Sequence, residues 1–181
     1  MSNLLHDNHY TVGELTKKLA SKLTDAGLRL TTAESCTGGK LSVALCAEEN
    51  TADFYDVGLV VFSDAAKARI LGVRPETLAR YTAVSEQTVT EMAASIRDIA
   101  QADISIAISG YAGPEGGDDG TAAGTVCFAW NIRGETKTRT VLFSGDCQDV
   151  VEKAVHFSLA ELVTTLSDGN NGCVHVEVLW L

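Results

Sequence analysis

The stretch Leu28-Arg-Leu-Thr-Thr-Ala-Glu-Ser-Cys-Thr-Gly-Gly39 decides the fold of this 181-residue chain. Its first half, up to Ala33, predicts a short strand, and Glu34 to Gly39 is a turn of small residues. An Ala- and Leu-rich helix is expected to follow, to about Ala47. A strand that passes into a helix in this way indicates an α/β sheet, and ligands of such sheets bind outside the carboxyl ends of the strands.

Helix patterns alternate with apolar strand patterns over most of the chain, and two late strands indicate an antiparallel hairpin. This order predicts a three-layer α/β/α sandwich with a mixed, mostly parallel sheet. The run from Val57 to Ser63 is nearly all apolar, which is typical of a strand buried on both faces. The other expected elements are a helix from the capping box at Thr11 to about Ala26, a helix capped by Asp64 and containing Lys67, a helical turn at Pro75, a helix capped by Ser85, the strand Asp103 to Ser109, the hairpin strands Val126 to Ile132 and Thr138 to Phe143, and a last helix from about Asp149 to Leu166.

The composition is that of one globular domain, with 45% hydrophobic and 21% charged residues. We expect a single domain over residues 1–166 and a tail over 167–181. Within the tail, Val174 to Leu181 is compatible with a short strand, a partner-binding segment or disorder. The formal net charge of −10 would repel nucleic-acid phosphates, which argues against a general nucleic-acid binder. A small phosphate-bearing ligand is still compatible with a locally positive pocket.

The five cysteines are odd in number and form no C-x-x-C motif, which indicates a reducing, cytoplasmic location rather than a disulfide framework or a zinc ribbon. The first ten residues lack the features of a signal peptide. No apolar run reaches about 18 residues, so no membrane span is expected. No cluster of acidic, His or Cys residues has convincing metal-ligand spacing, and we expect neither a metal nor a cofactor.

The first candidate for chemistry is the turn from Glu34 to Gly39. Ser35 and Thr37 supply hydroxyls, Cys36 supplies a thiol, and the amides around Gly38 and Gly39 are placed to meet an anion at a helix N-terminus. Taken alone, the same residues are also compatible with a tight turn that caps a helix.

The second candidate is Gly110-Tyr-Ala-Gly-Pro-Glu-Gly-Gly117, which follows a strand predicted to be buried. Its amides, with the freedom given by Gly110, Gly113, Gly116 and Gly117, are suited to cradle a phosphate or a ribose. An ordinary surface connection is the alternative. The spacing matches neither a P-loop nor a dinucleotide fingerprint.

The third candidate is Phe62-Ser63-Asp64-Ala-Ala-Lys67. A serine nucleophile needs a base, and a lysine can be one if burial lowers its pKa from about 10.4 toward neutrality. A solvated helix lysine is the alternative.

The order of these segments resembles the CinA C-terminal-domain family over about Thr11 to Leu166. The two glycine-containing motifs in this order are far more specific than either alone. The segments that carry the resemblance are TAESCTGG at Thr32 to Gly39, Phe62-Ser63 with Lys67, Leu71-Gly-Val73, Ala83-Val-Ser-Glu86, ISGYAGPEGG at Ile108 to Gly117, AGTV at Ala123 to Val126, and FSGD at Phe143 to Asp146.

Active members of this family are nicotinamide-mononucleotide amidohydrolases of pyridine-nucleotide salvage and use no metal or redox cofactor. The resemblance implies that Ser35 is the nucleophile and Lys67 its general base. The small-molecule nucleotide would then be held by a set of turn and loop residues, and a homo-oligomer is the reasonable expectation. The implied substrate-binding residues are Cys36, Thr37, Gly38, Gly39, Phe62, Ser63, Ser109, Gly110, Gly113, Gly116 and Gly117.

The chain departs from the family pattern at basic and hydroxyl positions. Phe62 replaces a tyrosine, Asp64 replaces an asparagine, Cys147 replaces an arginine and Thr121 replaces a lysine. A missing proton-transfer partner typically costs 10²–10⁴-fold in rate, and a carboxylate beside Lys67 favours its protonated form. The sequence therefore leaves open an amidohydrolase, weakened or inactive, and a non-catalytic nucleotide-binding or interaction paralogue.

Overall fold

The protein, described over residues 10–168 by a computed structural model, is built around a five-stranded sheet of order β2-β1-β3-β4-β5. The parallel pairs are β1 with β2 and β1 with β3, whereas β4 is antiparallel to both β3 and β5. All strands except β4 therefore run in one direction, which confirms the mixed, mostly parallel sheet. The strands are β1 (Leu30–Glu34), β2 (Tyr55–Val60), β3 (Ile104–Gly110), β4 (Thr125–Ile132) and β5 (Glu135–Leu142).

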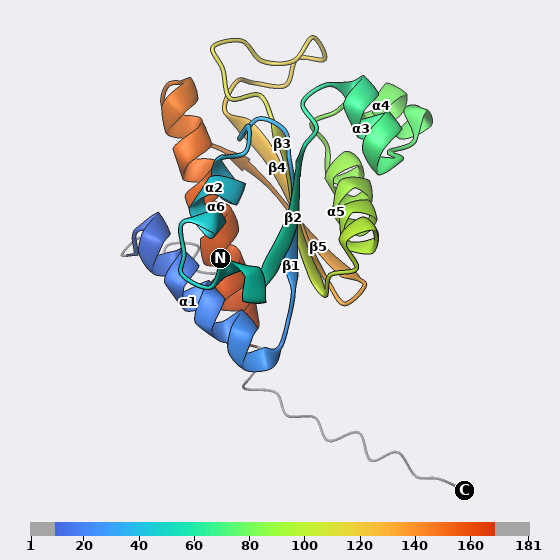
Figure 1. Cartoon of the computed structure of the whole chain (residues 1–181). Helices are drawn as coiled ribbons and strands as arrows, with labels where there is room; N and C mark the ends of the chain where they lie inside the picture. The colour runs from blue at the N-terminus through green and yellow to red at the C-terminus, as the bar shows by residue number, and fades with distance from the viewer. Residues whose placement is uncertain (1–9, 169–181) are drawn as a thin grey trace, which may run out of the picture.

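Helices cover both faces of this sheet, which confirms the three-layer sandwich (Figure 1). One apolar core lies between the sheet and α1, α2 and α6, and it includes the stacked rings of Phe128 and Trp130. A second core lies under α3, α4 and α5. The helices are α1 (Val12–Ala26), α2 (Lys40–Cys46), α3 (Asp64–Leu71), α4 (Pro75–Tyr81), α5 (Glu86–Ala100) and α6 (Cys147–Asp168), with a 3₁₀ turn at Thr51–Asp53.

Local capping signals place most helix ends. The capping box of Thr11 and Glu14 begins α1, Gly27 ends it in the left-handed conformation, and Ser85 caps α5, all as predicted. The prediction that Asp64 caps the next helix is wrong. Ser63 has the extended backbone of an N-cap and its hydroxyl accepts from the Ala66 amide, so Asp64 is the first residue inside α3.

Strand β2 differs from its prediction. The apolar run from Val57 to Ser63 was expected to be buried on both faces, but β2 is an edge strand that ends at Val60, whose side chain is 51% exposed. An apolar run does not reveal the position of its strand in the sheet. At the edge of the sheet, β2 has a neighbouring strand on one side alone, and its side chains alternate between more and less buried positions.

The late elements follow the prediction with small shifts. The antiparallel hairpin of β4 and β5 is confirmed, although β5 begins at Glu135 rather than Thr138. The last helix begins at Cys147, two residues before the expected start. The expected tail segment Val174 to Leu181 lies outside the described residues. Between residues 10 and 168, no helix combines the length and the apolarity that crossing a membrane requires.

Candidate active site

The turn between β1 and α2 is organised by a buried carboxylate. Glu34, fully buried at the end of β1, accepts hydrogen bonds from the Thr37 hydroxyl at 2.7 Å, the Gly39 amide at 3.1 Å and the Leu41 amide at 3.0 Å. Its other oxygen accepts from the amide and hydroxyl of Ser42 at 2.8 and 2.6 Å. A carboxylate at this place satisfies the free amides of the helix start and is stabilised by the helix dipole.

This network continues into the interior of the protein. The Ser42 hydroxyl accepts from Tyr55 at 2.9 Å, and the Tyr55 and Thr32 hydroxyl oxygens lie 2.7 Å apart. Gly58 leaves room for these groups, because a Cβ there would lie 2.0 Å from the Tyr55 hydroxyl oxygen. The turn is therefore fixed to both β1 and β2 by buried polar contacts.

Two of the amides predicted to hold a ligand are already used inside the protein. The Gly38 amide donates to the Ser35 carbonyl at 3.1 Å and the Gly39 amide donates to Glu34. Of the amides from Thr37 to Gly39 that are predicted to hold a ligand, these two therefore already have acceptors within the chain, and ligand binding by this turn stays a prediction. Among residues 10–168, the amides of Cys36 and Thr37 donate to no backbone carbonyl. Backbone N–H groups directly after a nucleophile are the usual components of an oxyanion hole.

Ser35 and Lys67 lie within hydrogen-bonding distance of each other. The Lys67 ammonium nitrogen donates to Ser35 Oγ at 3.1 Å and to the Phe62 carbonyl at 2.9 Å. Both side chains are buried, with Lys67 only 1% exposed. The start of α3, set by the Ser63 cap, places Lys67 on the fourth residue of the helix and directs it back to the end of β1.

Burial lowers the pKa of Lys67, and this effect outweighs the nearby negative groups. Asp64, whose carboxylate lies 3.9 Å from the Lys67 nitrogen, is the larger of the two contributions that raise this pKa, and Cys36 is the smaller. Asp64 is 61% exposed, so solvent screens its charge. The pKa of Lys67 is therefore lower than that of a solvated lysine, which makes the neutral form, the one that can accept a proton, more accessible.

Cys36 is a poor alternative nucleophile. Burial raises the pKa of its thiol to about 12, even though the Lys67 charge acts in the opposite direction. Its side chain packs against the core under α1, α2 and α6. A thiol with this pKa is protonated at neutral pH and behaves as a small apolar group.

Phe62 contributes its backbone rather than its ring. The carbonyl of Phe62 accepts from Lys67, and from Ser35 Oγ at 3.4 Å, whereas the ring is 73% exposed. Ser63 acts as the cap of α3, and no contact of its side chain reaches the Ser35–Lys67 pair among the described residues.

Ser109 lies beside Ser35. Glu34 pairs with Ile108 in the parallel register, and the Ser35 amide donates to the Ile108 carbonyl at 2.9 Å, so the next residue of β3 is the neighbour of Ser35. Gly110 follows, and a Cβ there would lie 2.8 Å from the Thr125 carbonyl oxygen. Close packing of β3 on β4 therefore explains this glycine.

The glycine-rich loop after β3 forms one wall of a pocket of about 440 Å³. Within the loop, the Gly117 amide donates to the Thr121 carbonyl at 2.8 Å, and a Cβ on Gly116 would lie 2.1 Å from the same oxygen. The loop thus packs on itself and faces the start of α6. The residues that line the pocket are Ala112, Gly113, Pro114, Ala123, Gly124, Gly145, Asp146 and Cys147.

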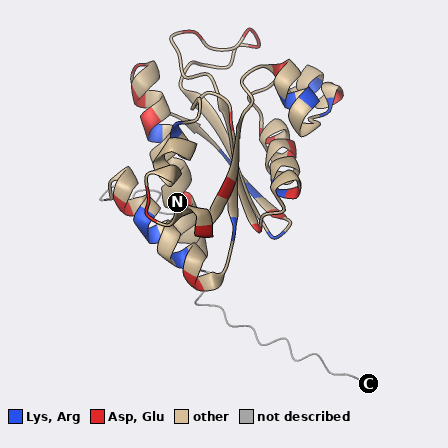
Figure 2. Cartoon of the chain, viewed as in Figure 1, with Lys and Arg blue, Asp and Glu red and all other residues tan. Residues whose placement is uncertain are grey.

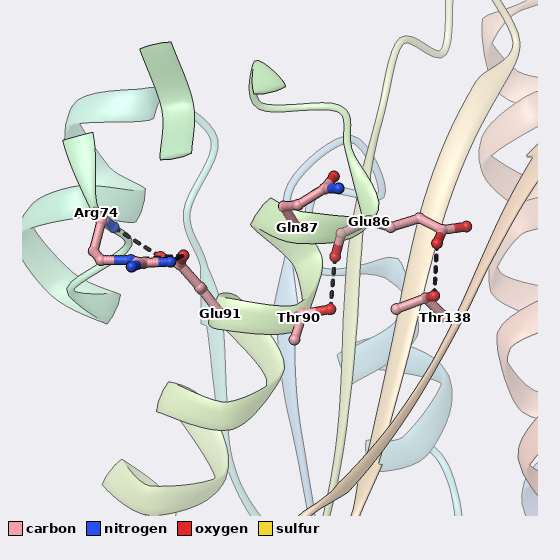
Figure 3. Close-up of a pocket in the computed structure, with 6 residues that line it drawn as sticks. All are labelled: Arg74, Glu86, Gln87, Thr90, Glu91 and Thr138. Carbon is pink, nitrogen blue, oxygen red and sulfur yellow. Dashed lines mark hydrogen bonds and ion pairs between the residues drawn. The ribbon is translucent and has the colours of Figure 1, made fainter. Parts of the chain in front are cut away.

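A second pocket, of about 360 Å³, lies at the start of α5 (Figure 3). Its charged groups are already paired, because Arg74 contacts Glu91 at 2.6 Å and Glu86 accepts from Thr138 at 2.8 Å. These contacts hold α4 and β5 against α5. The pairing of these side chains is accounted for by the packing of α4 and β5 on α5.

Metal ligation has no support between residues 10 and 168, where no group of three or more His, Cys, Asp or Glu side chains is arranged to hold an ion. The buried carboxylate of Glu34 has both oxygens occupied by donors of the chain.

The role of Glu34 as the acceptor that organises the turn was not found from the sequence. One available signal was the position of Glu34, an acidic residue between an apolar strand and a helix whose first turn contains Ser42. Such an acid can satisfy helix-start amides from the N-terminal side.

Comparisons with known proteins agree with this geometry. The family model described as "CinA C-terminal domain" matches residues 12–166. The chain is 54% identical to protein YdeJ of Escherichia coli K12 over 156 residues, which cover 86% of this chain and 91% of that protein. It is 41% identical to the nicotinamide-nucleotide amidohydrolase PncC of the same organism over 150 residues, which cover 82% and 91% of the two chains.

A solved structure shows the same fold. The crystal structure of a competence or damage-inducible protein from Enterobacter asburiae superposes with a TM-score of 0.87 at 92% identity, covering 87% of this chain and 99% of that one. The motifs around Ser35 and the glycine-rich loop lie inside the matched residues 12–166. The chain therefore belongs to the CinA C-terminal domain family.

Proposed function

We propose that this protein is a serine–lysine amidohydrolase that hydrolyses the carboxamide of a nicotinamide nucleotide or a close relative of it. The observation that carries this proposal is the 3.1 Å contact between Ser35 Oγ and the buried Lys67 nitrogen. The similarity to a nicotinamide-nucleotide amidohydrolase supports the type of substrate.

The first half-reaction forms an ester on Ser35. Neutral Lys67 takes the proton of the Ser35 hydroxyl as Oγ attacks the amide carbon, and the amides of Cys36 and Thr37 donate to the developing oxyanion. The C–N bond then breaks, Lys67 gives the proton to the departing nitrogen, and ammonia leaves.

The second half-reaction releases the acid. Lys67 takes a proton from water, the resulting hydroxide attacks the ester carbon, and Ser35 recovers its proton from Lys67 as the carboxylic acid departs. The Phe62 carbonyl holds the lysine in both steps through its 2.9 Å hydrogen bond. The absence of a hydroxyl on the exposed Phe62 ring leaves the proton transfer to Ser35 and Lys67 alone.

The direct test is ammonia release from nicotinamide mononucleotide by the purified protein. We expect turnover that falls at least about 10³-fold in Ser35→Ala and in Lys67→Met. Ser21→Ala is the matched control, since Ser21 lies exposed on α1. Lys67→Met keeps a buried chain of similar length without a titrating nitrogen, so circular dichroism can show that the fold is retained.

A non-catalytic paralogue is the competing function. It would bind the nucleotide without releasing ammonia, and Ser35→Ala would then change neither the binding nor the background rate. That result, with a folded wild-type protein, would exclude the amidohydrolase.

A further inference from the structure

Thr82, the residue that follows α4, has a backbone conformation that residues with a side chain rarely adopt. Its φ of 65° and ψ of 175° lie in a region populated essentially by glycine. Asn50 and Gln101 also have positive φ, but their ψ angles of 30° and 42° place them in the ordinary left-handed region. A β-branched residue such as threonine is therefore strained at position 82.

The backbone hydrogen bonds of Thr82 explain how this conformation is kept. Its amide donates to the Leu78 carbonyl at 3.0 Å, and its carbonyl accepts from the hydroxyls of Ser85 at 3.1 Å and Thr88 at 2.7 Å. These bonds use only backbone atoms of residue 82, so a glycine would make all of them without the strain. The reason for a threonine here must therefore lie in its side chain.

The Thr82 side chain lies against the glycine-rich loop. Burial raises the pKa of Tyr111 most, and the neighbouring Thr82 hydroxyl opposes this rise. The Thr121 backbone amide lowers the pKa of Asp119 most, and the Thr82 hydroxyl adds to this fall. The Thr82 oxygen is buried, and within residues 10–168 none of its contacts has the geometry of a hydrogen bond. Strain and burial thus both disfavour this threonine as far as stability is concerned.

Tyr111 continues β3 on the face of the sheet that carries α3. Its amide donates to the Thr125 carbonyl at 2.9 Å and its carbonyl accepts from the Gly124 amide at 2.6 Å, so the contact between β3 and β4 extends beyond their last pair. Alternate residues of a strand share a face, which groups Tyr111 with Ser109 and Ala107. Ala107 belongs to the core under α3, α4 and α5, and Tyr111 packs against this core.

This position brings Tyr111 close to the Ser35–Lys67 pair. Ser109 is the neighbour of Ser35, and alternate residues of a strand lie about 7 Å apart, so Tyr111 is one such step from Ser109. Burial is the largest cause of the raised pKa of Tyr111, and Asp64, which lies 3.9 Å from the Lys67 nitrogen, adds to it. The same carboxylate therefore acts on the lysine and on the phenol, which places the phenol on the α3 side of the site.

The Tyr111 ring also packs on the glycine-rich loop. A Cβ on Gly117 would lie 2.7 Å from Cε2 of this ring, so the ring fills the space that a larger residue would need. Residues 111–124 of the loop include acidic side chains and no basic ones (Figure 2). Because burial and these acids raise its pKa, the phenol stays protonated at neutral pH, and Tyr111 presents an uncharged aromatic ring.

We propose that Tyr111 packs against the aromatic ring of the substrate and that Thr82 is the positioning residue that holds Tyr111 there. This inference rests on the proposed function. In a nicotinamide nucleotide the ring is bonded directly to the carboxamide carbon that Ser35 would attack, so the ring has to lie next to Ser35. A tyrosine face attracts a pyridinium ring through stacking and the cation–π interaction. A strained residue with a buried hydroxyl is then kept for substrate binding rather than for stability.

Calorimetric titration with nicotinamide mononucleotide tests the ring contact without chemistry when every protein carries Ser35→Ala. We expect Tyr111→Ala to raise Kd by about 10-fold, the factor that a cation–π contact can supply. Tyr111→Leu keeps an apolar side chain of similar bulk and should show the same loss, so a packing defect would not explain it. In proteins that retain Ser35, both substitutions should raise KM more than they lower kcat.

Thr82→Gly separates substrate binding from stability. Relief of the strain and removal of the buried hydroxyl should raise the midpoint of urea denaturation. Loss of the contact with Tyr111 should raise Kd by about 3-fold or more, and adding Thr82→Gly to Tyr111→Ala should raise Kd no further. Thr82→Ser keeps the hydroxyl and should restore binding. Gln101→Gly is the matched control, because it relieves a positive φ at the other end of α5 and should raise the urea midpoint without changing Kd.

The outcomes separate this inference from the proposed function. Weaker binding by Tyr111→Ala, with no ammonia release by the wild-type protein, would support the ring contact and reject the amidohydrolase. An unchanged Kd in Tyr111→Ala, with ammonia release that still depends on Ser35, would overturn the ring contact and leave the amidohydrolase intact. A lower urea midpoint in Thr82→Gly, or additive effects of Thr82→Gly and Tyr111→Ala on Kd, would overturn the positioning role. Failure of the mononucleotide to bind the Ser35→Ala protein would overturn the whole inference.

Discussion

Asp64 is the residue whose negative charge most opposes the lowering of the Lys67 pKa by burial. Its carboxylate raises the pKa of Lys67, against the larger lowering by burial. In Asp64→Asn this contribution is lost, so the Lys67 pKa falls further and neutral lysine is present at lower pH. We expect the rising limb of kcat/KM against pH to move to lower pH, with an unchanged plateau above it.

The matched control for this pH profile is Asp25→Asn, on α1 across the sheet from α3. A shift of similar size in both variants would mean that the overall charge, rather than the contact between Asp64 and Lys67, is responsible. A shift to higher pH in Asp64→Asn would contradict the assignment of Lys67 as the base.

Cys36 should be chemically inert despite its place next to Ser35. With a thiol pKa of about 12 it holds almost no thiolate at pH 8. Cys46 and Cys147 are exposed and should be alkylated first by iodoacetamide. Peptide mass spectrometry of the native protein checks the order, and early labelling of Cys36 would show that the turn opens or that its thiol is not buried.

At the scale of elements, the β1–α2 turn depends on the charge of Glu34. Glutamine has nearly the same shape, but its amide group cannot accept the hydrogen bonds that one carboxylate oxygen receives here. We expect Glu34→Gln to lower the free energy of unfolding by about 1–3 kcal/mol. It should also lower kcat more than KM, because the amides of Cys36 and Thr37 move with the turn.

Thr37→Val is the matched comparison for Glu34→Gln, since it removes the single 2.7 Å hydrogen bond from the Thr37 hydroxyl. Urea denaturation should show a smaller loss for Thr37→Val than for Glu34→Gln. Equal losses of unfolding free energy in the two variants would mean that the hydrogen bonds from the helix-start amides to Glu34 contribute little to stability.

The elements were predictable where local chemistry alone decides them. The capping box at Thr11, the Ser85 cap and the β4–β5 hairpin depend on neighbours in the chain, and all three were predicted. The burial of Val57 to Ser63 was not, because an edge position follows from strand order. Ser63 and Asp64 are both good caps, and the backbone geometry at Ser63 decides between them.

The site could be predicted only in part. The family resemblance implies that Ser35 and Lys67 act as a pair. Their 3.1 Å contact agrees with that hypothesis. Their catalytic roles are still a prediction. Glu34 was missed because an acid at a strand end suits a turn, a metal or a substrate equally well. Its five donors come from the folded turn, which no local pattern shows.

At the scale of the whole molecule, a substitution in the core on one face of the sheet should lower stability without changing the proposed activity on the other face. Phe157 on α6 packs on Phe128, with ring centroids 5.0 Å apart, on the face opposite α3 and Lys67. We expect Phe157→Ala to cost about 3 kcal/mol of unfolding free energy. The kcat of the folded protein should change less than about twofold.

Denaturation followed by the fluorescence of the buried Trp130 measures this loss, and Phe157→Leu should recover most of it. A large fall in kcat with an intact fold would show that the two faces are coupled through the sheet.

Ser35 and Lys67 come from successive β–α units, with the exposed residues Glu49 and Asn50 between them along the chain. Two polypeptides divided at that point would carry the proposed nucleophile on one fragment and its proposed base on the other, so neither fragment would hold the Ser35–Lys67 pair. The ladder between β1 and β2 would rejoin them. For the proposed amidohydrolase, the fold is therefore suited to a split reporter, in which ammonia release would signal that two fused partners have met.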